Sequence, residues 1–164
     1  MSLKWDKQDL MTIAEKKIQE VNADCENVIY RGIDVELSKG TQHFSLTTKD
    51  QINIDSLFST ITLGATEFPY HVDDTQCEMF SAEDIIKLYI AYKSFVTEQT
   101  TYCNMLRTWI KRETNSVIVT ITYGDDLPVD LQEDMNELLE KANIQIQAVV
   151  AKLQTAGIAA TSET

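Results

Sequence analysis

The chain has 164 residues, a length that suits one domain or one domain with a helical appendage. Its composition, 43% hydrophobic and 24% charged residues, is that of a globular chain and excludes a disordered or collagen-like one. A formal charge of -12 opposes binding to nucleic acid and to anionic membrane surfaces, so we expect neither as a partner.

The N-terminus and the cysteines indicate a protein made in a reducing cytosol. The first nine residues mix lysine with aspartate and lack the apolar stretch of a secretory signal. No window approaches the roughly 18 apolar residues of a membrane span. Cys25, Cys77 and Cys103 form an odd and widely spaced set that implies no disulfide framework.

An amphipathic helix is predicted from Trp5 to about Cys25. Its apolar residues recur every three or four positions, the period that places them on one helical face. Turn-prone residues from Asn22 onward weaken the pattern. From Val28 to Leu37, and again from His43 to Leu46, apolar and polar residues partly alternate on either side of the turn sequence 38–41, which predicts a β-hairpin.

A second helix is predicted to begin after Thr47 or Thr48, because either hydroxyl can accept a hydrogen bond from the first helical turn. Gly64 fits a left-handed stop for this helix. Residues 68–72 and 76–80 are predicted to form two short extended segments joined by an acidic turn.

The longest predicted helix begins after Ser81 and reaches about Ile110. Ser81 with Glu83 and Asp84 resembles a capping box, and one apolar stripe continues for about eight turns. This helix is predicted to be the spine of the fold. Asn115–Tyr123 is rich in β-branched residues and has strand propensity, but packing can override that preference, so both strand and helix stay open.

A last helix is predicted to begin near Pro128, a residue that suits a first helical turn, after the break at 124–127. Acidic residues near its start complement the positive end of the helix dipole. Its apolar residues follow at spacings of 4, 3, 4, 4, 3 and 4, nearly the heptad repeat of a coiled coil. So narrow a stripe predicts a partner helix; its residues are Leu131, Met135, Leu138, Ala142, Ile146, Val149 and Leu153.

These elements predict an α+β fold that is mainly helical. A small β-hairpin or sheet would pack on the long central helix, and an extended C-terminal helix would follow. Residues 1–124 are expected to form a compact α+β domain, residues 125–155 the C-terminal amphipathic helix, and residues 156–164 a flexible tail.

No catalytic or metal-binding motif is visible in the sequence. His43 and His71 could gather a metal with Cys77 and the aspartates at 73 and 74, but their spacing matches no zinc pattern. Nothing near the cysteines would activate a thiol, and the Asp pairs at 73–74 and 125–126 lie in turn sequences. We expect no metal, no cofactor and no enzymatic activity. A small metal-dependent hydrolase using His43, His71 and Cys77 is the alternative from another class.

Aromatic residues of the long helix are predicted to lie mostly in the core, because aromatics at helical spacing are more typical of packing than of a ligand groove. Phe95, Tyr102 and Trp109 fall partly off its main stripe. Exposed aromatic residues often anchor partner proteins. The predicted protein interface therefore comprises Leu131, Met135, Leu138, Ile146, Val149, Leu153, Trp109 and Phe95.

One stretch of the chain resembles a known family. The run His43-Phe44-Ser45-Leu46-Thr47, with Asp50-Gln51-Ile52-Asn53-Ile54 after it, resembles a motif of phage tail-fibre and tail-assembly proteins that carry a domain of unknown function (DUF4376-like). In that family a hairpin ending in a His-Phe strand leads into a D-Q-x-N-I helix, then an extended pair and a Ser/Thr-capped helix. The later parts match 70–72, 78–80 and 81–88, so the resemblance covers roughly residues 32–110.

The resemblance implies a non-enzymatic structural component of a phage or prophage tail or baseplate, either a fibre-associated or an adaptor subunit. Such a protein would be present in the host cytoplasm during assembly and then in the virion tail or a tail-like particle. The chain lacks the long fibrous repeats of a tail fibre, so a tail-fibre assembly chaperone is the alternative. The implied partners are proteins, namely other tail or baseplate subunits and a second copy of this chain.

Overall fold

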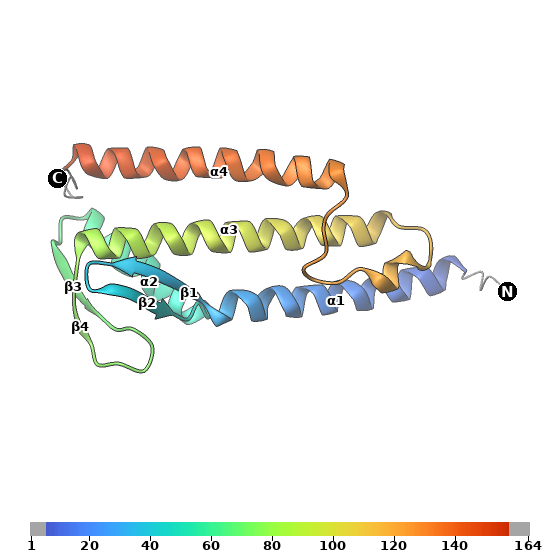
Figure 1. Cartoon of the computed structure of the whole chain (residues 1–164), viewed down its shortest axis with the longest axis horizontal. Helices are drawn as coiled ribbons and strands as arrows, with labels where there is room; N and C mark the ends of the chain where they lie inside the picture. Colours follow the sequence, from blue (N-terminus) through green and yellow to red (C-terminus); the bar gives the residue numbers. More distant parts are fainter. Residues whose placement is uncertain (1–5, 158–164) are drawn as a thin grey trace. The chain divides into compact units, whose positions relative to one another are not determined.

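The computed structural model describes residues 6–157 (Figure 1). Within these residues the chain forms four α-helices, one 3₁₀ helix and two separate antiparallel sheets of two strands each, which confirms the predicted mainly helical α+β fold. None of the described helices combines the length and the apolar character needed to cross a membrane. The elements are α1 (Lys7–Arg31), β1 (Ile33–Leu37), β2 (Gly40–Phe44), α2 (Thr48–Thr62), β3 (Glu67–Tyr70), β4 (Glu78–Ser81), α3 (Ala82–Arg112), η1 (Ser116–Thr120) and α4 (Val129–Thr155).

The described residues divide into two compact units. The first unit contains residues 6–28 and 98–140, and the second contains residues 29–97 and 141–157. The boundary falls inside α1, α3 and α4, so each of these helices contributes a segment to both units. The predicted division between residues 124 and 125 stays a prediction, and the predicted flexible tail lies outside the described residues from 158 onward.

The core of the first unit is built from helical segments. Val21 and Cys25 on α1 are buried, as are Cys103, Leu106 and Ile110 on α3, and each set follows helical spacing. The segment that follows α3 and the first half of α4 also contribute to this core. Their buried residues are Ile118, Ile121, Leu127, Leu131 and Met135.

The segment 115–123, for which both strand and helix were open, forms a short 3₁₀ helix. The Asn115 side chain accepts a hydrogen bond from the Val117 N–H at 2.8 Å and caps η1. Ile118 and Ile121 are buried one turn apart, while Val117 and Val119 are exposed. No described strand pairs with this segment, so its strand propensity has no partner strand. Burial of the two isoleucines favours the helical turn instead.

A tyrosine fixes the break before α4 within the first unit. The Tyr102 hydroxyl donates to the Asp125 carbonyl oxygen at 2.6 Å and accepts from the Gly124 N–H at 2.9 Å. The Asp125 carboxylate accepts from the Thr122 N–H at 2.7 Å, the local turn bond expected of an aspartate there. Gly124 has φ 104°, a left-handed conformation that glycine adopts without steric cost.

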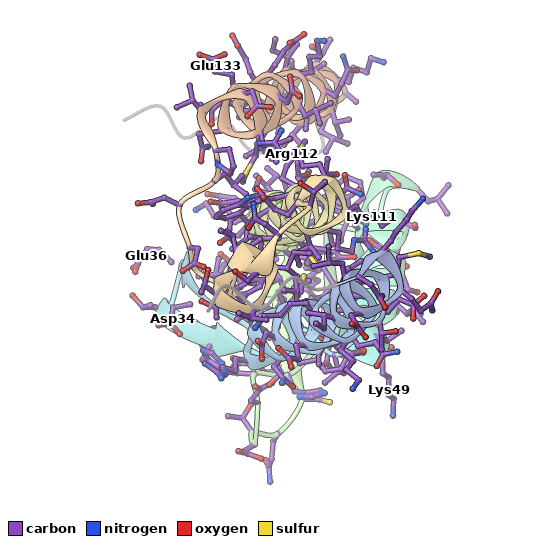
Figure 2. The ribbon with its side chains drawn as sticks, turned by 90° about the vertical axis from the view of Figure 1, so that its right-hand side faces the viewer. Asp34, Glu36, Lys49, Lys111, Arg112 and Glu133 are labelled. Carbon is purple, nitrogen blue, oxygen red and sulfur yellow. The ribbon has the colours of Figure 1, made fainter. Side chains whose placement is uncertain are left out.

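The hairpin of the second unit begins later than the sequence predicted. The predicted strand from Val28 is wrong at its start, because α1 continues to Arg31 and Ile29 keeps the four-residue spacing of the buried stripe. β1 and β2 then pair from Ile33 with Phe44 to Leu37 with Gly40. Their side chains alternate: Val35 and Leu37 are buried, whereas Asp34 and Glu36 lie on the outer face (Figure 2).

An aromatic cluster joins the two small sheets. The Phe44 ring centroid lies 6.3 Å from that of Tyr70 and 6.3 Å from that of Phe80, and Tyr70 and Phe80 are 6.1 Å apart. All three rings are buried, each from a different strand. Burial raises the pKa of Tyr70 to about 12, so its hydroxyl stays neutral at physiological pH.

Side-chain caps fix the starts of α2 and α3, as the sequence predicted. Thr47 and Asp50 form a reciprocal capping box, with the Thr47 N–H donating to the Asp50 carboxylate at 3.0 Å. The Ser81 hydroxyl accepts from the Asp84 N–H at 3.1 Å. The buried Asp84 carboxylate also accepts from the N–H of Ser38 at 2.9 Å and from its hydroxyl at 2.5 Å, which attaches the hairpin turn to α3.

Gly32, just before β1, and Gly40, at the start of β2, give a matched test of how closely β2 approaches the end of α1. Gly32 has φ 85°, and a Cβ added there would lie 1.9 Å from the Phe44 carbonyl oxygen; Gly40 has φ 102°, with open space around it. Gly32→Ala should lower the free energy of unfolding by roughly 3 kcal/mol or more, whereas Gly40→Ala should cost about 1 kcal/mol of backbone strain alone. Urea denaturation of both variants measures the difference. Equal losses would contradict the close approach of β2 to Gly32.

A candidate protein-binding surface on helix α4

The predicted interface residues of α4 are partly buried within their own units. In the first unit Leu131 and Met135 are buried, while Leu138 is 50% exposed. In the second unit Leu153 is buried, Ile146 is half-buried and Val149 is 41% exposed. The stripe therefore packs against the same chain at some positions and leaves large apolar side chains in solvent at others.

The two aromatic residues predicted to lie at the interface are both half-buried. Phe95 belongs to the second unit and Trp109 to the first. The indole Nε1–H of Trp109 donates to the Glu113 carboxylate at 2.9 Å, one turn along the chain, so its polar edge has a partner already. Neither ring is a freely exposed anchor, and their role in an interface stays a prediction.

The start of α4 is held by an ion pair inside the first unit. The Arg112 guanidinium donates from Nη2 to the Asp130 Oδ1 at 3.0 Å, and a second bond links Nη1 to Oδ2. This two-pronged hydrogen bond holds the pKa of Asp130 below its ordinary value. The Arg112 side chain is 39% exposed and the Asp130 side chain 64% exposed, so solvent screens the pair, and it orients the first turn of α4 more than it stabilises the fold.

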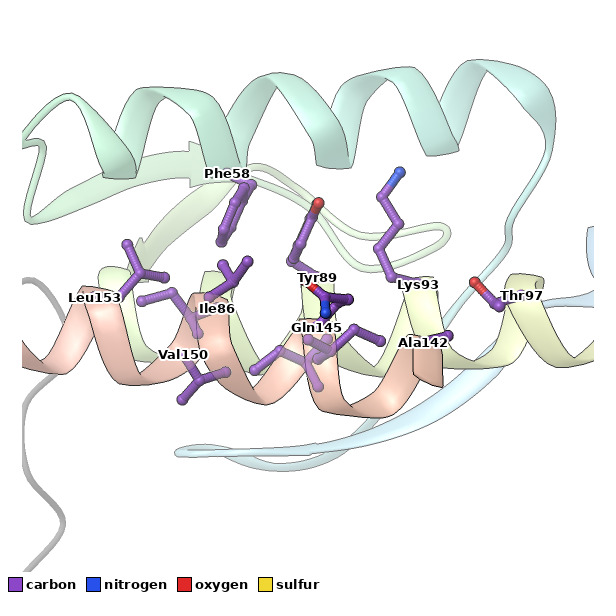
Figure 3. Close-up of a pocket in the computed structure, with 12 residues that line it drawn as sticks. Phe58, Ile86, Tyr89, Lys93, Thr97, Ala142, Gln145, Val150 and Leu153 are labelled. Carbon is purple, nitrogen blue, oxygen red and sulfur yellow. The ribbon is translucent and has the colours of Figure 1, made fainter. Parts of the chain in front are cut away.

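A half-open pocket of about 270 Å³ lies in the second unit (Figure 3). Residues of α2, α3 and the second half of α4 surround it, and most of them are apolar. Three of the predicted interface residues, Ile146, Val149 and Leu153, line the pocket. The remaining lining residues are Phe58, Ile86, Tyr89, Ile90, Lys93, Thr97, Ala142, Gln145 and Val150.

Aromatic stacking forms one wall of the pocket. The rings of Phe58 and Tyr89 are parallel within 7°, with centroids 3.6 Å apart, and Figure 3 shows them side by side. Tyr89 also meets Tyr92 edge to face, at a centroid distance of 6.2 Å. Such ring pairs contribute to stability beyond the area that they bury.

Lys93, the one lysine that lines the pocket, already forms an ion pair. Its Nζ lies 2.9 Å from the Asp55 Oδ1, 3.1 Å from the Tyr92 hydroxyl and 4.7 Å from the centre of the Tyr92 ring. Burial lowers the pKa of Lys93, but the hydrogen bonds to Asp55 and Tyr92 outweigh burial and raise it. The pocket thus offers no unpaired positive charge to an anionic ligand, and its chemistry favours an apolar group with polar contacts at the edge.

The family of the chain follows from its sequence between residues 12 and 123, which matches DUF4376, a domain of unknown function. The chain belongs to the DUF4376 family. No curated protein and no solved structure matches it. The DUF4376 match includes both hairpins, α2 and α3 but ends before Val129, so the part of the surface that α4 contributes lies outside the matched residues.

Sequence reasoning missed part of the pocket. Ile86, Ile90, Lys93 and Thr97 follow at spacings of 4, 3 and 4 on α3, parallel to the buried stripe of Ile85, Leu88 and Tyr92. This second stripe could have been recognised in the sequence as a sign that α3 is covered on two sides. Gln145 and Val150 on α4 gave no such signal, because they flank the predicted seam.

The residues of the hydrolase alternative are not gathered. His43 contacts the Asp34 carboxylate at 2.7 Å and the Arg31 carbonyl oxygen at 2.8 Å, and His71 contacts the Val72 carbonyl oxygen at 3.2 Å. The Asp73 carboxylate accepts from the Ser45 N–H at 2.9 Å. Among residues 6–157, no three side chains of His, Cys, Asp or Glu come together in a group that could hold a metal ion.

The pairing of His43 with Asp34 can be tested by titration. The hydrogen bond that the His43 Nδ1–H donates to the Asp34 carboxylate favours the charged imidazole and raises the pKa of His43 above its ordinary 6.5. Asp34→Asn should lower the NMR-measured pKa of His43 towards 6.5. Glu36→Gln, which removes a carboxylate from the same face of β1, is the control and should change it less.

The same pair has a consequence for stability. Because the folded-state pKa of His43 is raised, its stabilising contribution is fully present below pH 6.5 and is lost as the pH rises through the folded-state value. The Asp34→Asn chain should lose this pH dependence of the unfolding free energy. Equal titration curves for the Asp34 and Glu36 variants would contradict the pairing.

Proposed function

We propose that this chain is a non-enzymatic component of a phage or prophage tail or baseplate, and that it binds other subunits through apolar residues of α4. The tail assignment is supported by the resemblance carried by residues 43–54, within the DUF4376 match. On this proposal the chain is made in the host cytoplasm and remains in the finished particle.

The proposed binding role is supported chiefly by the position of Val149. This side chain is 41% exposed and lines the half-open, largely apolar pocket of the second unit. Covering exposed apolar surface contributes about 25 cal/mol for each Å² removed from water. An apolar side chain of a partner that enters the pocket would therefore find favourable contacts, whereas a charged group would lose its hydration.

Two exposed residues of α4 provide the test variant, and a third provides its control. Leu138 in the first unit and Val149 in the second both belong to the predicted stripe. Ile144 is 57% exposed but faces away from the stripe, since the two residues from Ala142 to Ile144 turn the helix by about 200°. Leu131, Met135 and Leu153 are left unchanged, because they are buried and their loss would unfold the units.

Replacing Leu138 and Val149 together by Asp should weaken association by roughly 10²- to 10³-fold, because two carboxylates would enter an apolar contact. Light scattering of the full chain at several concentrations measures this as a fall from multimer to monomer. The unfolding midpoint should stay near that of the unchanged chain, since both positions are exposed. Ile144→Asp should leave the mass as it was.

An unchanged multimeric mass in the double variant would contradict the proposal, as would equal dissociation in the Ile144→Asp chain. A chain that is monomeric at every concentration would exclude a second copy as the partner. Incorporation of the same variants into tails then replaces the mass as the measurement, with the double variant expected to be left out.

Mass spectrometry of purified particles distinguishes a structural component from an assembly chaperone. A component should be present at a fixed ratio to other tail proteins. A chaperone would occur in the infected-cell lysate and be absent from the particles.

A further inference from the structure

The cysteines of this chain are placed unequally. Cys77 is exposed between β3 and β4, whereas Cys25 on α1 and Cys103 on α3 are buried in the core of the first unit. About 78 residues separate Cys25 from Cys103 in the sequence, and that spacing gave no reason to pair them.

Reciprocal contacts place the two buried thiols against each other. The Cys25 Sγ donates to the Gln99 carbonyl oxygen at 3.5 Å, one turn before Cys103 on α3. The Cys103 Sγ lies 3.9 Å from the Val21 carbonyl oxygen, one turn before Cys25 on α1, and 3.6 Å from the Asn22 Oδ1. Burial and the hydrogen bond to Cys103 raise the pKa of the Cys25 thiol to about 12. The two helices therefore run antiparallel within this unit, with their cysteines facing.

We propose that Cys25 and Cys103 form an intramolecular disulfide that links α1 to α3 when the protein folds or opens in an oxidising environment. The oxidant is a low-molecular-weight disulfide such as oxidised glutathione. One cysteine thiolate attacks it, forming a mixed disulfide and releasing one reduced glutathione. The second thiolate then attacks the protein sulfur of that mixed disulfide and releases another. Two protein S–H bonds are lost, one S–S bond forms, and two electrons reduce the oxidant.

The burial of the thiols sets the conditions for this reaction. A thiol with so high a pKa is almost entirely protonated at neutral pH, and only the thiolate attacks a disulfide. The bond should therefore form slowly in the folded protein and readily during folding or on transient opening of the unit. Once formed, it is shielded from reductants by the same packing.

The three cysteines make the chain its own control. In the unfolded chain, loop closure favours short loops, so the pair 77–103 should make up about two-thirds of the links and 25–103 only about one in eight. In the folded chain the thiols of Cys25 and Cys103 face each other, so the 25–103 link should become the most frequent.

The reduced chain is refolded from urea in a mixture of reduced and oxidised glutathione, alkylated and mapped by mass spectrometry. A second sample is oxidised in urea. The link 25–103 should dominate after refolding and be the rarest in urea.

The same distribution of links in both samples would overturn the proposal. So would a refolded chain in which Cys25 and Cys103 both remain free while Cys77 carries glutathione.

Thermal unfolding adds a second measurement: oxidation of a Cys77→Ser chain should raise its Tm by roughly 5–15 °C. A chain with both Cys77→Ser and Cys103→Ala should show no shift on oxidation, whatever its starting Tm. A lowered Tm on formation of the link would mean that the bond distorts the unit, and the proposed fit would be wrong.

Discussion

The second unit depends on a helix that is apolar on two sides. The buried stripe of α3, with Ile85, Leu88 and Tyr92, requires the cover that the rest of the unit provides. Its neighbouring stripe, with Ile86 and Ile90, requires a cover of its own, and the second half of α4 provides it incompletely. The pocket of about 270 Å³ is the space that remains. Because interiors are normally close-packed, such a gap at a solvent boundary marks a place where another group can be accommodated.

Polar contacts join the first hairpin to α3 and to the loop of the second hairpin. The buried Asp84 carboxylate accepts both hydrogen bonds offered by Ser38, and Asp73 accepts the N–H of Ser45, just after β2. Each carboxylate thus provides an acceptor for a part-buried backbone N–H that would otherwise lack one. These contacts all lie within the part of the chain that matches DUF4376, whereas α4 lies beyond it.

The sequence determined the elements that follow from local chemistry. The caps at Thr47 and Ser81, the left-handed stop at Gly64 and the period of the apolar residues can all be read along the chain, and each appears where it was expected. The same reasoning placed the end of α1 too early, because turn-prone residues after Val21 suggested a stop. Ile29 continues the buried stripe, and tertiary burial outweighs a weak local preference.

Only the tertiary structure decided which distant residues meet. Cys25 and Cys103 looked unrelated in sequence and lie against each other because α1 and α3 run antiparallel in the first unit. The seam of α4 looked like a surface waiting for a partner helix, yet Leu131, Met135 and Leu153 are buried within the chain's own units, and Leu138 and Val149 remain exposed. Periodicity shows which face of a helix must be covered. It does not show what covers it, because that depends on contacts between segments far apart in the sequence.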